Sequence, residues 1–226
     1  EIPLRLVGSE MCIRDRDGGN LIFSPEEREL LISKEKGAEK FLKKFTGATE
    51  FLNNKERWVL WLDGVSPSEY ESFPTIMKRI DQVRKFREKS VAKATQKYAE
   101  TPAIFCQIAQ PDSDYLIVPS VSSEKRKYIP IGYLDKNVIA SNLALIVPNA
   151  SYYEFGILTS SIHMAWVRAV AGRLEMRYRY SKDVVYNNFP WPTITEKTRK
   201  KVEETAKRIL DVRNRFTGCS LASINF

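Results

Sequence analysis

The chain has 226 residues, of which 43% are hydrophobic and 11% aromatic, and it carries a formal net charge of +8 at pH 7. This composition is that of a globular protein with a hydrophobic core, which excludes a disordered or low-complexity chain. The excess of lysine and arginine favours a polyanionic partner, but an ordinary basic protein has the same balance, so charge alone does not decide.

The first sixteen residues differ in character from the rest of the chain. Residues 6–16 resemble the translation of a sequencing-library adapter, whose transposon-end DNA reads as Glu-Met-Cys-Ile-Arg-Asp in one frame. We extend this interpretation to residues 1–5, so residues 1–16 are predicted to be a scar and are excluded from fold reasoning. The natural sequence is then expected to begin near Asp17, and the chain is expected to be a fragment at both ends.

A turn and a helix start open the remaining sequence. Residues 17–20 have turn composition, Asp-Gly-Gly-Asn. Ser24 before Pro25 and two acids predicts a helix over about residues 25–35. Residues 58–62 are an apolar run between charged residues and an Asp-Gly turn, which predicts a short strand.

Residues 76–99 show the clearest helical pattern. Apolar residues recur at helical spacing at Ile76, Ile80, Val83, Val91, Ala94 and Tyr98. The other faces are basic and carry Lys78, Arg79, Arg84, Lys85, Arg87, Lys89, Lys93 and Lys97. Two readings stay open for this basic surface, a solvated helix face and a helix that follows a phosphate backbone.

The pattern then changes to short β-rich runs, followed by helices. The runs are residues 103–108, 115–119, 128–133, 138–140 and 144–147, separated by turns. Residues 155–171 are predicted to be helical, and residues 196–215 form an amphipathic helix. The predicted fold class is α+β, a curved antiparallel sheet with flanking helices followed by a C-terminal helix.

The first candidate site is a polar run between two of the β-rich runs. A serine hydroxyl can contact base edges or phosphates, a glutamate can accept from the amino group of cytosine, and an arginine can donate to guanine or phosphate. A polar hairpin loop without a ligand has the same composition. The candidate DNA-binding residues in this run are Ser122, Ser123, Glu124, Arg126 and Lys127.

The second candidate site lies within residues 172–181. Glu175 and Arg177 alternate, so on an extended segment both side chains point to the same side. Such a pair suits a C·G base pair, because the acid accepts from cytosine while the guanidinium donates to the guanine opposite. A surface ion pair on a strand is the alternative. Arg179 completes this candidate DNA-binding set.

The remaining polar residues favour structural roles. His163 lies on an apolar helical stretch and is predicted to be a hydrogen-bonded core residue. Residues 187–192, Asn-Asn-Phe-Pro-Trp-Pro, lack the Pro-Pro pair of amino-methyltransferase motifs and are predicted to be a rigid connection in which Phe189 and Trp191 pack.

Catalytic, cofactor-binding and metal-binding residues are not expected in this chain. No glycine-rich cofactor loop follows a strand, and no nuclease or nucleophile–histidine–acid set is present in the sequence. Cys12, Cys106 and Cys219 have no paired spacing, which excludes a zinc-finger pattern and fits a reducing cytoplasm. Cys106 is predicted to be a buried strand thiol, and no run approaches the length of a membrane span.

Several of these motifs, in this order, resemble the target recognition domain of MmeI-like restriction–modification enzymes, bacterial proteins that methylate adenine in DNA. The resemblance runs from Asp17 to about Leu221. It rests on Asp-Gly-Gly-Asn-Leu, residues 58–62, the basic helix, Ser-Ser-Glu-Lys-Arg-Lys-Tyr-Ile-Pro-Ile-Gly at 122–132, His-Met-Ala-Trp-Val-Arg at 163–168, Gly-Arg-Leu at 172–174 and Phe-Pro-Trp-Pro at 189–192.

The resemblance implies a DNA target recognition domain over residues 17–192 and the start of a truncated C-terminal helical domain over residues 193–226. It implies that Glu175 and Arg177 read one base pair, and it favours DNA contact for the run at 122–127. Lys125 stands where arginine is common in the family, which weakens any bidentate contact there. The implied partners are double-stranded DNA and an upstream methyltransferase domain of the same parent chain, which would use S-adenosylmethionine to methylate adenine at N6.

Two alternatives stay open. The chain could be a free-standing nucleic-acid-binding module or a specificity subunit without its own catalytic domain, or it could be an interaction domain whose charge serves solubility. An in-frame methyltransferase sequence upstream distinguishes the first alternative, and sequence-blind DNA binding distinguishes the second.

Overall fold

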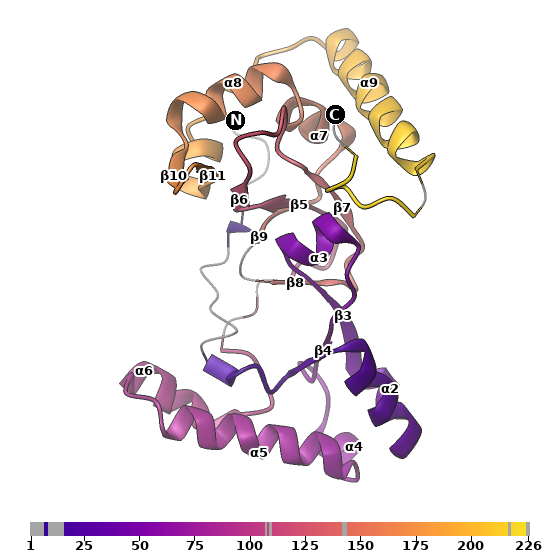
Figure 1. Ribbon diagram of the computed structural model, residues 1–226, viewed down its shortest axis with the longest axis vertical. Coiled ribbons are helices and arrows are strands. Elements are labelled where there is room, and N and C mark those ends of the chain that lie inside the picture. Colours follow the sequence, from indigo (N-terminus) through magenta and orange to yellow (C-terminus); the bar gives the residue numbers. More distant parts are fainter. Residues whose placement is uncertain are drawn as a thin grey trace.

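The computed structural model describes residues 7–8, 16–106, 108, 110–141, 144–216 and 218–224. Its elements surround two hydrophobic cores. The ribbon is elongated, with α5 near one end and α8 and α9 near the other (Figure 1). The first core contains Leu21, Val59 and Ile76, and the second contains Leu116, Phe155 and Ala206. Most of the predicted scar, with Cys12, lies outside the described residues, so its origin stays a prediction.

The first core is built on a four-stranded sheet of order β2-β4-β3-β8. Its strands are β2 (Ile22–Phe23), β3 (Leu42–Thr46), β4 (Trp58–Leu60) and β8 (Ile139–Ala140). Only the β3–β8 pairing is parallel among the described strands of this sheet. The accompanying helices are α2 (Pro25–Lys34), α3 (Ala48–Asn53), α4 (Pro67–Tyr70), α5 (Pro74–Glu88) and α6 (Lys93–Gln96), with 3₁₀ turns at Ala38–Phe41 and Lys97–Glu100.

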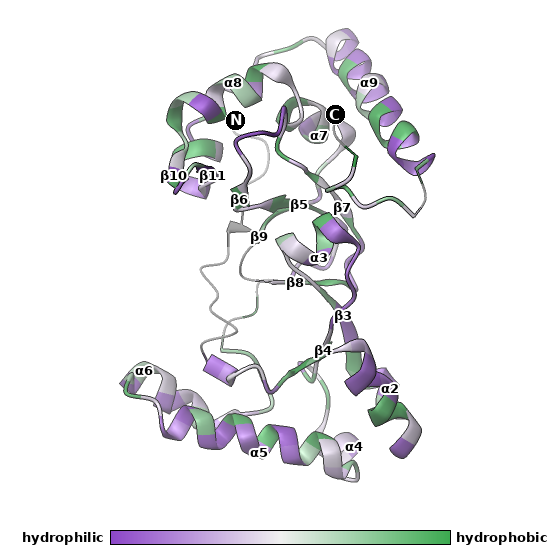
Figure 2. Ribbon diagram, in the orientation of Figure 1, coloured by the Kyte–Doolittle hydropathy of each residue, from purple (hydrophilic) through white to green (hydrophobic). Residues whose placement is uncertain are grey.

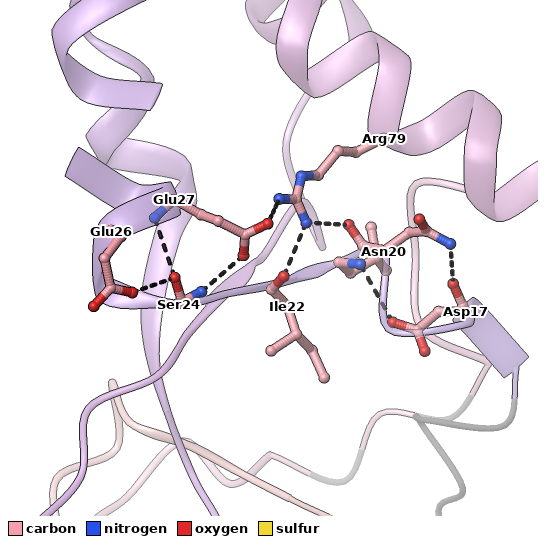
Figure 3. A network of polar contacts seen from close by, with 8 residues as sticks. Asp17, Asn20, Ile22, Ser24, Glu26, Glu27 and Arg79 are labelled. Carbon is pink, nitrogen blue, oxygen red and sulfur yellow. Dashed lines mark hydrogen bonds and ion pairs between the residues drawn. The ribbon is translucent and has the colours of Figure 1, made fainter. Parts of the chain in front are cut away.

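Helix α2 begins where the sequence predicts. The Ser24 hydroxyl accepts a hydrogen bond from the amide of Glu27 at 3.2 Å, and the Glu27 carboxylate accepts from the amide of Ser24 at 2.9 Å. Arg79 of α5 reaches this capping box, donating to Glu27 at 2.6 Å and to the carbonyls of Asn20 and Ile22 (Figure 3). These bonds fix α5 against the start of α2.

The prediction of one helix over residues 76–99 was wrong. Ile76, Ile80 and Val83 are buried as expected, but α5 ends at Glu88 and Val91 is fully exposed. The physical reason is Arg87, whose buried guanidinium donates to the carbonyls of Tyr98, Thr101 and Ile104. The chain after α5 must fold back beside the helix to bring those carbonyls to one side chain.

The predicted basic surface is therefore partly used within the fold. Arg87 is buried, Arg79 lies 3.8 Å over the ring of Phe23, and Lys85 pairs with Asp81 at 2.6 Å. The predicted strand at residues 103–108 was also wrong for the described positions, because the Ile104 carbonyl accepts from Arg87 and not from a strand partner. Cys106 is accordingly half-buried in an irregular segment and is not a buried strand thiol.

The second core contains most of the predicted antiparallel sheet. The run predicted at residues 138–140 was placed wrongly, because it forms β8 and pairs parallel with β3 in the first sheet. The sheet of the second core has the order β1-β9-β5-β7, and every pairing in it is antiparallel. The strands are β1 (Val7–Gly8), β5 (Tyr115–Pro119), β7 (Gly132–Leu134) and β9 (Ala144–Pro148). Strand β5 is buried along its whole length, and Figure 2 shows it as hydrophobic while α5 and the last helix carry many hydrophilic residues. The α+β class with an antiparallel sheet and flanking helices is confirmed.

The described helices on the second core are α7 (Tyr152–Leu158), α8 (Ser161–Val170), α9 (Glu196–Asn214) and a short π-helix, Lys182–Tyr186. The helix predicted over residues 155–171 is therefore interrupted at Thr159 and Ser160. A Cβ on Gly156 of α7 would lie 2.8 Å from Val202 of α9, so this glycine permits the close approach of the two helices. Helix α9 thus packs on the same core as the sheet, and the domain boundary at residue 192 stays a prediction.

No helix in the described part of the chain has the length and apolar character needed to cross a membrane.

Candidate nucleic-acid interface

A third sheet brings the two candidate sites together. It has the order β10-β11-β6 and consists of β6 (Val121–Ser122), β10 (Gly172–Leu174) and β11 (Arg177–Arg179). Strand β11 pairs antiparallel with β6 through Tyr178 opposite Ser122 and Arg179 opposite Val121. The polar run that follows β6 therefore lies next to the β10–β11 hairpin, although the two are far apart in the sequence (Figure 1).

Glu175 lies in the hairpin turn and not on an extended strand, which corrects the predicted geometry. Leu174 pairs with Arg177, so Glu175 and Met176 form a two-residue turn, and Glu175 has a φ of +58°. Such turns need a positive φ, which glycine and asparagine adopt more easily than glutamate does. The two charged side chains still meet, because Arg177 Nη2 lies 2.7 Å from Glu175 Oε2 in an exposed ion pair.

Arg173, which was not a candidate site residue, contacts both the strand and the turn of the hairpin. The guanidinium of Arg173 lies 3.9 Å from the ring centre of Tyr178, which is buried in the second core. The same guanidinium donates to the carbonyl of Met176 at 3.5 Å. Arg179 is exposed at the far end of β11. The only sequence signal for Arg173 was its place in the Gly-Arg-Leu motif.

The residues of the polar run have different environments. Ser122 is buried on β6, and its hydroxyl has no hydrogen-bond partner among the described residues. Ser123 accepts a bond from the amide of Lys125 at 3.2 Å, and Arg126 donates to the carbonyl of Leu221 at 3.4 Å. Glu124 is half-buried and Lys127 is exposed. The run is therefore a structured loop, and Ser122 does not present its hydroxyl on the surface.

The end of α9 and the segment after it contact the residues around this loop. Arg213 of α9 donates to the carbonyl of Ile131, and burial lowers the pKa of its guanidinium. Further along, the amide of Ala222 donates to the carbonyl of Leu52 in α3 at 2.8 Å. The segment after α9 thus contacts α3 through Ala222 and the polar loop through Leu221, which accepts from Arg126.

The predicted structural roles of His163, Phe189 and Trp191 are confirmed. The His163 ring meets the Phe189 ring edge to face at 4.6 Å, and Phe189 meets Trp191 in the same way at 5.4 Å. His163 is fully buried, with Nε2 2.9 Å from the hydroxyl of Tyr180. The connection at residues 187–192 therefore packs on the second core through Phe189 and Trp191.

Burial of His163 gives the first testable prediction. Desolvation lowers the pKa of its imidazole from 6.5 to about 4. The folded state then binds fewer protons than the unfolded state between these pH values. The contribution of His163 to the free energy of unfolding is therefore fully present above pH 6.5 and falls as the pH drops towards 4. We expect the free energy of unfolding to fall by roughly 1.4 kcal/mol per pH unit from this group at the steepest point.

Urea unfolding of the natural chain and of His163→Phe, measured at several pH values between 4 and 7, checks this slope. The comparison isolates the histidine because the buried carboxyl of Asp17, whose pKa is raised by desolvation, contributes in the opposite direction in both chains. Equal pH slopes for the two chains would contradict the assignment.

Comparison with solved structures gives the class of protein. The chain matches a structure described as the Type IIL restriction-modification enzyme MmeI in complex with DNA, with a TM-score of 0.90 and 47% identity, covering 93% of this chain and 28% of that one. It shares the fold alone with the type IIG restriction endonuclease BpuSI, at a TM-score of 0.51 and 16% identity, covering 84% and 23% of the two chains. The fold is that of a DNA target recognition domain.

The sequence gives the family. Residues 8–193 match the profile described as "MmeI, target recognition domain". DNA methyltransferase A of Bacillus subtilis (strain 168) is 41% identical over 202 residues, which are 89% of this chain and 23% of the relative. The chain belongs to the MmeI target recognition domain family, as its motifs indicated, and it spans about a quarter of the length of these relatives.

Proposed function

We propose that this chain reads the DNA sequence for a site-specific methyltransferase of a restriction–modification system. The observation that carries this proposal is the third sheet, which joins the polar loop after β6 to the tip of the β10–β11 hairpin. A two-stranded ribbon of this kind fits the major groove, where every base pair presents a distinct pattern of donors and acceptors.

The charges on this surface suit DNA. Arg177 and Arg179 are exposed on the hairpin, and Lys127 is exposed on the loop, so phosphate contacts and base contacts can be made from one side of the sheet. Glu175 is the base-reading acid, and its ion pair with Arg177 keeps both groups in place before DNA arrives. Ser123, Glu124 and Arg126 complete the candidate set, while Ser122 requires a movement of β6 to expose its hydroxyl.

The chemistry belongs to the parent protein. We propose that an upstream domain of the same parent binds S-adenosylmethionine and methylates adenine at N6, acting in the cytoplasm. The relative named DNA methyltransferase A and the likeness to a restriction-modification enzyme in complex with DNA support this proposal. The described residues contain no group of three or more potential metal ligands, and no metal-dependent step is proposed for this chain.

Selection from a pool of randomised DNA duplexes tests the function. We expect the chain to enrich a defined short sequence, and its dissociation constant for that sequence to rise at least about tenfold between 50 and 200 mM salt. The salt effect follows from release of counterions when lysines and arginines neutralise phosphates. Lys127→Gln should reduce the salt slope, whereas the matched change Lys36→Gln, at an exposed lysine beside the first core, should not.

Enrichment of no sequence, with equal affinity for all duplexes, would contradict the proposal. That result would favour an interaction domain whose charge serves solubility.

A further inference from the structure

The tip of the β10–β11 hairpin exposes a large apolar side chain. Met176 is 71% exposed in the two-residue turn, beside Leu174, which is 45% exposed. A two-residue hairpin turn ordinarily carries small or polar residues, because it faces water. Exposure alone does not imply a partner, because Ile162 on α8 is 74% exposed as well. What distinguishes Met176 is its place at the tip of the hairpin proposed to read DNA, between Glu175 and Arg177.

The turn that carries Met176 is contacted by the residues on both sides of it. The Met176 carbonyl accepts the hydrogen bond from Arg173 at 3.5 Å, and Arg173 in turn lies over the buried ring of Tyr178. On the other side, Glu175 has a φ of +58° and its carboxylate is paired with Arg177. An apolar side chain is therefore presented on a supported turn between two charged residues.

The surroundings of Met176 define the partner. The hairpin carries Arg173, Arg177 and Arg179 against a single acid, Glu175, so a polyanion is attracted to the tip. Within a DNA major groove, the apolar group available to a side chain is the 5-methyl group of thymine. Methionine is unbranched and polarisable, so it can adapt to such a group.

We propose that Met176 is a further specificity-determining residue, which packs against the 5-methyl group of thymine in the base pair next to the one read by Glu175 and Arg177. This inference rests on the proposed DNA-reading function. The major groove is favoured over a wedge between base steps because the neighbouring Glu175 and Arg177 need base edges within reach. If the hairpin tip were inserted between stacked base pairs, Glu175 and Arg177 would lie beyond the base edges that they are proposed to contact.

Selection from randomised duplexes, with the complete chain and its variants, tests the proposal. The natural chain should prefer T·A at one position, adjacent to the position whose preference changes when Glu175 and Arg177 are replaced. Met176→Ala should lose that preference by roughly fourfold, the value of about one buried methyl group, and keep the rest of the site. Ile162→Ala, at an apolar residue 74% exposed on α8, is the matched control and should select the unchanged site.

A second measurement removes the methyl group from the DNA. Replacing that thymine by uracil should weaken binding of the natural chain about as much as Met176→Ala does, and should have no further effect on the variant. An unchanged site for Met176→Ala overturns the proposal and leaves the DNA-reading function standing. A uniform loss for all sequences also overturns it and indicates a wedge or a non-specific contact. If the natural chain selects no sequence, the proposed function itself fails.

Discussion

We expect Arg87→Met to lower the free energy of unfolding by about 3–5 kcal/mol, because it removes the guanidinium that donates every described hydrogen bond of a buried polar network. The Arg87 side chain is fully buried, and its guanidinium donates to four carbonyls, those of Arg16 at 2.6 Å, Tyr98 at 2.9 Å, Thr101 at 2.8 Å and Ile104 at 3.0 Å. Methionine has a similar length but donates no hydrogen bond, so these carbonyls lose their partner inside the protein.

The loss extends to Asp17, which is also fully buried. Burial raises the pKa of its carboxyl, and the positive charge of Arg87 together with backbone amides opposes that rise. Without Arg87 the carboxylate would lack its compensating charge, and the turn at residues 17–20 would lose support.

Urea denaturation of the natural chain, Arg87→Met and Arg84→Met measures this effect. Arg84 is exposed on the same helix, so its replacement should change the free energy of unfolding by less than about 0.5 kcal/mol. Comparable stability of the two variants would show that the buried guanidinium contributes nothing beyond helix propensity.

The double replacement Glu175→Lys with Arg177→Asp should change the base pair that the chain prefers at one position. Aspartate can accept from cytosine and lysine can donate to guanine, so the exchange reverses the pattern that the pair presents to the groove. Each good contact contributes about 1–3 kcal/mol of discrimination, so the ratio of affinities for the old and new base pairs should change on the order of 100-fold. The fold should persist because the pair is exposed and keeps opposite charges.

Dissociation constants for four duplexes that differ only at the selected base pair measure this change. The control exchanges the charges of the exposed pair formed by Lys44 and Glu56, which lie 3.0 Å apart on and beside the first-core sheet. The control should keep the natural order of the four affinities. An unchanged order in the Glu175/Arg177 variant would remove these two residues from base reading.

Local signals in the sequence predicted local structure well. The capping residues at Ser24 and Glu27, the buried spacing of Ile76, Ile80 and Val83, and the buried strand over Tyr115–Pro119 all follow from patterns within a few residues. Capping residues and burial on one face determine these elements, and both can be recognised from residues close together in the sequence.

The failures lie where long-range contacts override that periodicity. The helix after Glu88 is lost because Arg87 is buried by segments that follow it, and a charged residue gives no sign of such burial in the sequence. The candidate site was predicted as two separate polar stretches. They lie side by side because Tyr178 pairs with Ser122, a contact between distant parts of the sequence. The hairpin turn requires a positive φ at Glu175, and a glutamate in the sequence does not predict one.

The contact between α3 and the strand after the polar loop limits how recognition can be transplanted. A Cβ on Gly132 would lie 2.6 Å from the ring of Phe51, and the carbonyl of Leu52, the next residue in α3, accepts from Ala222 in the segment after α9. A loop exchanged between two relatives would thus lose the contacts of its own α3 and C-terminal segment unless both are exchanged with it. Transfer of a new specificity therefore requires three segments that are separate in the sequence to be exchanged together: the loop with its following strand, α3, and the segment after α9. Point substitutions at the hairpin tip leave these contacts unchanged.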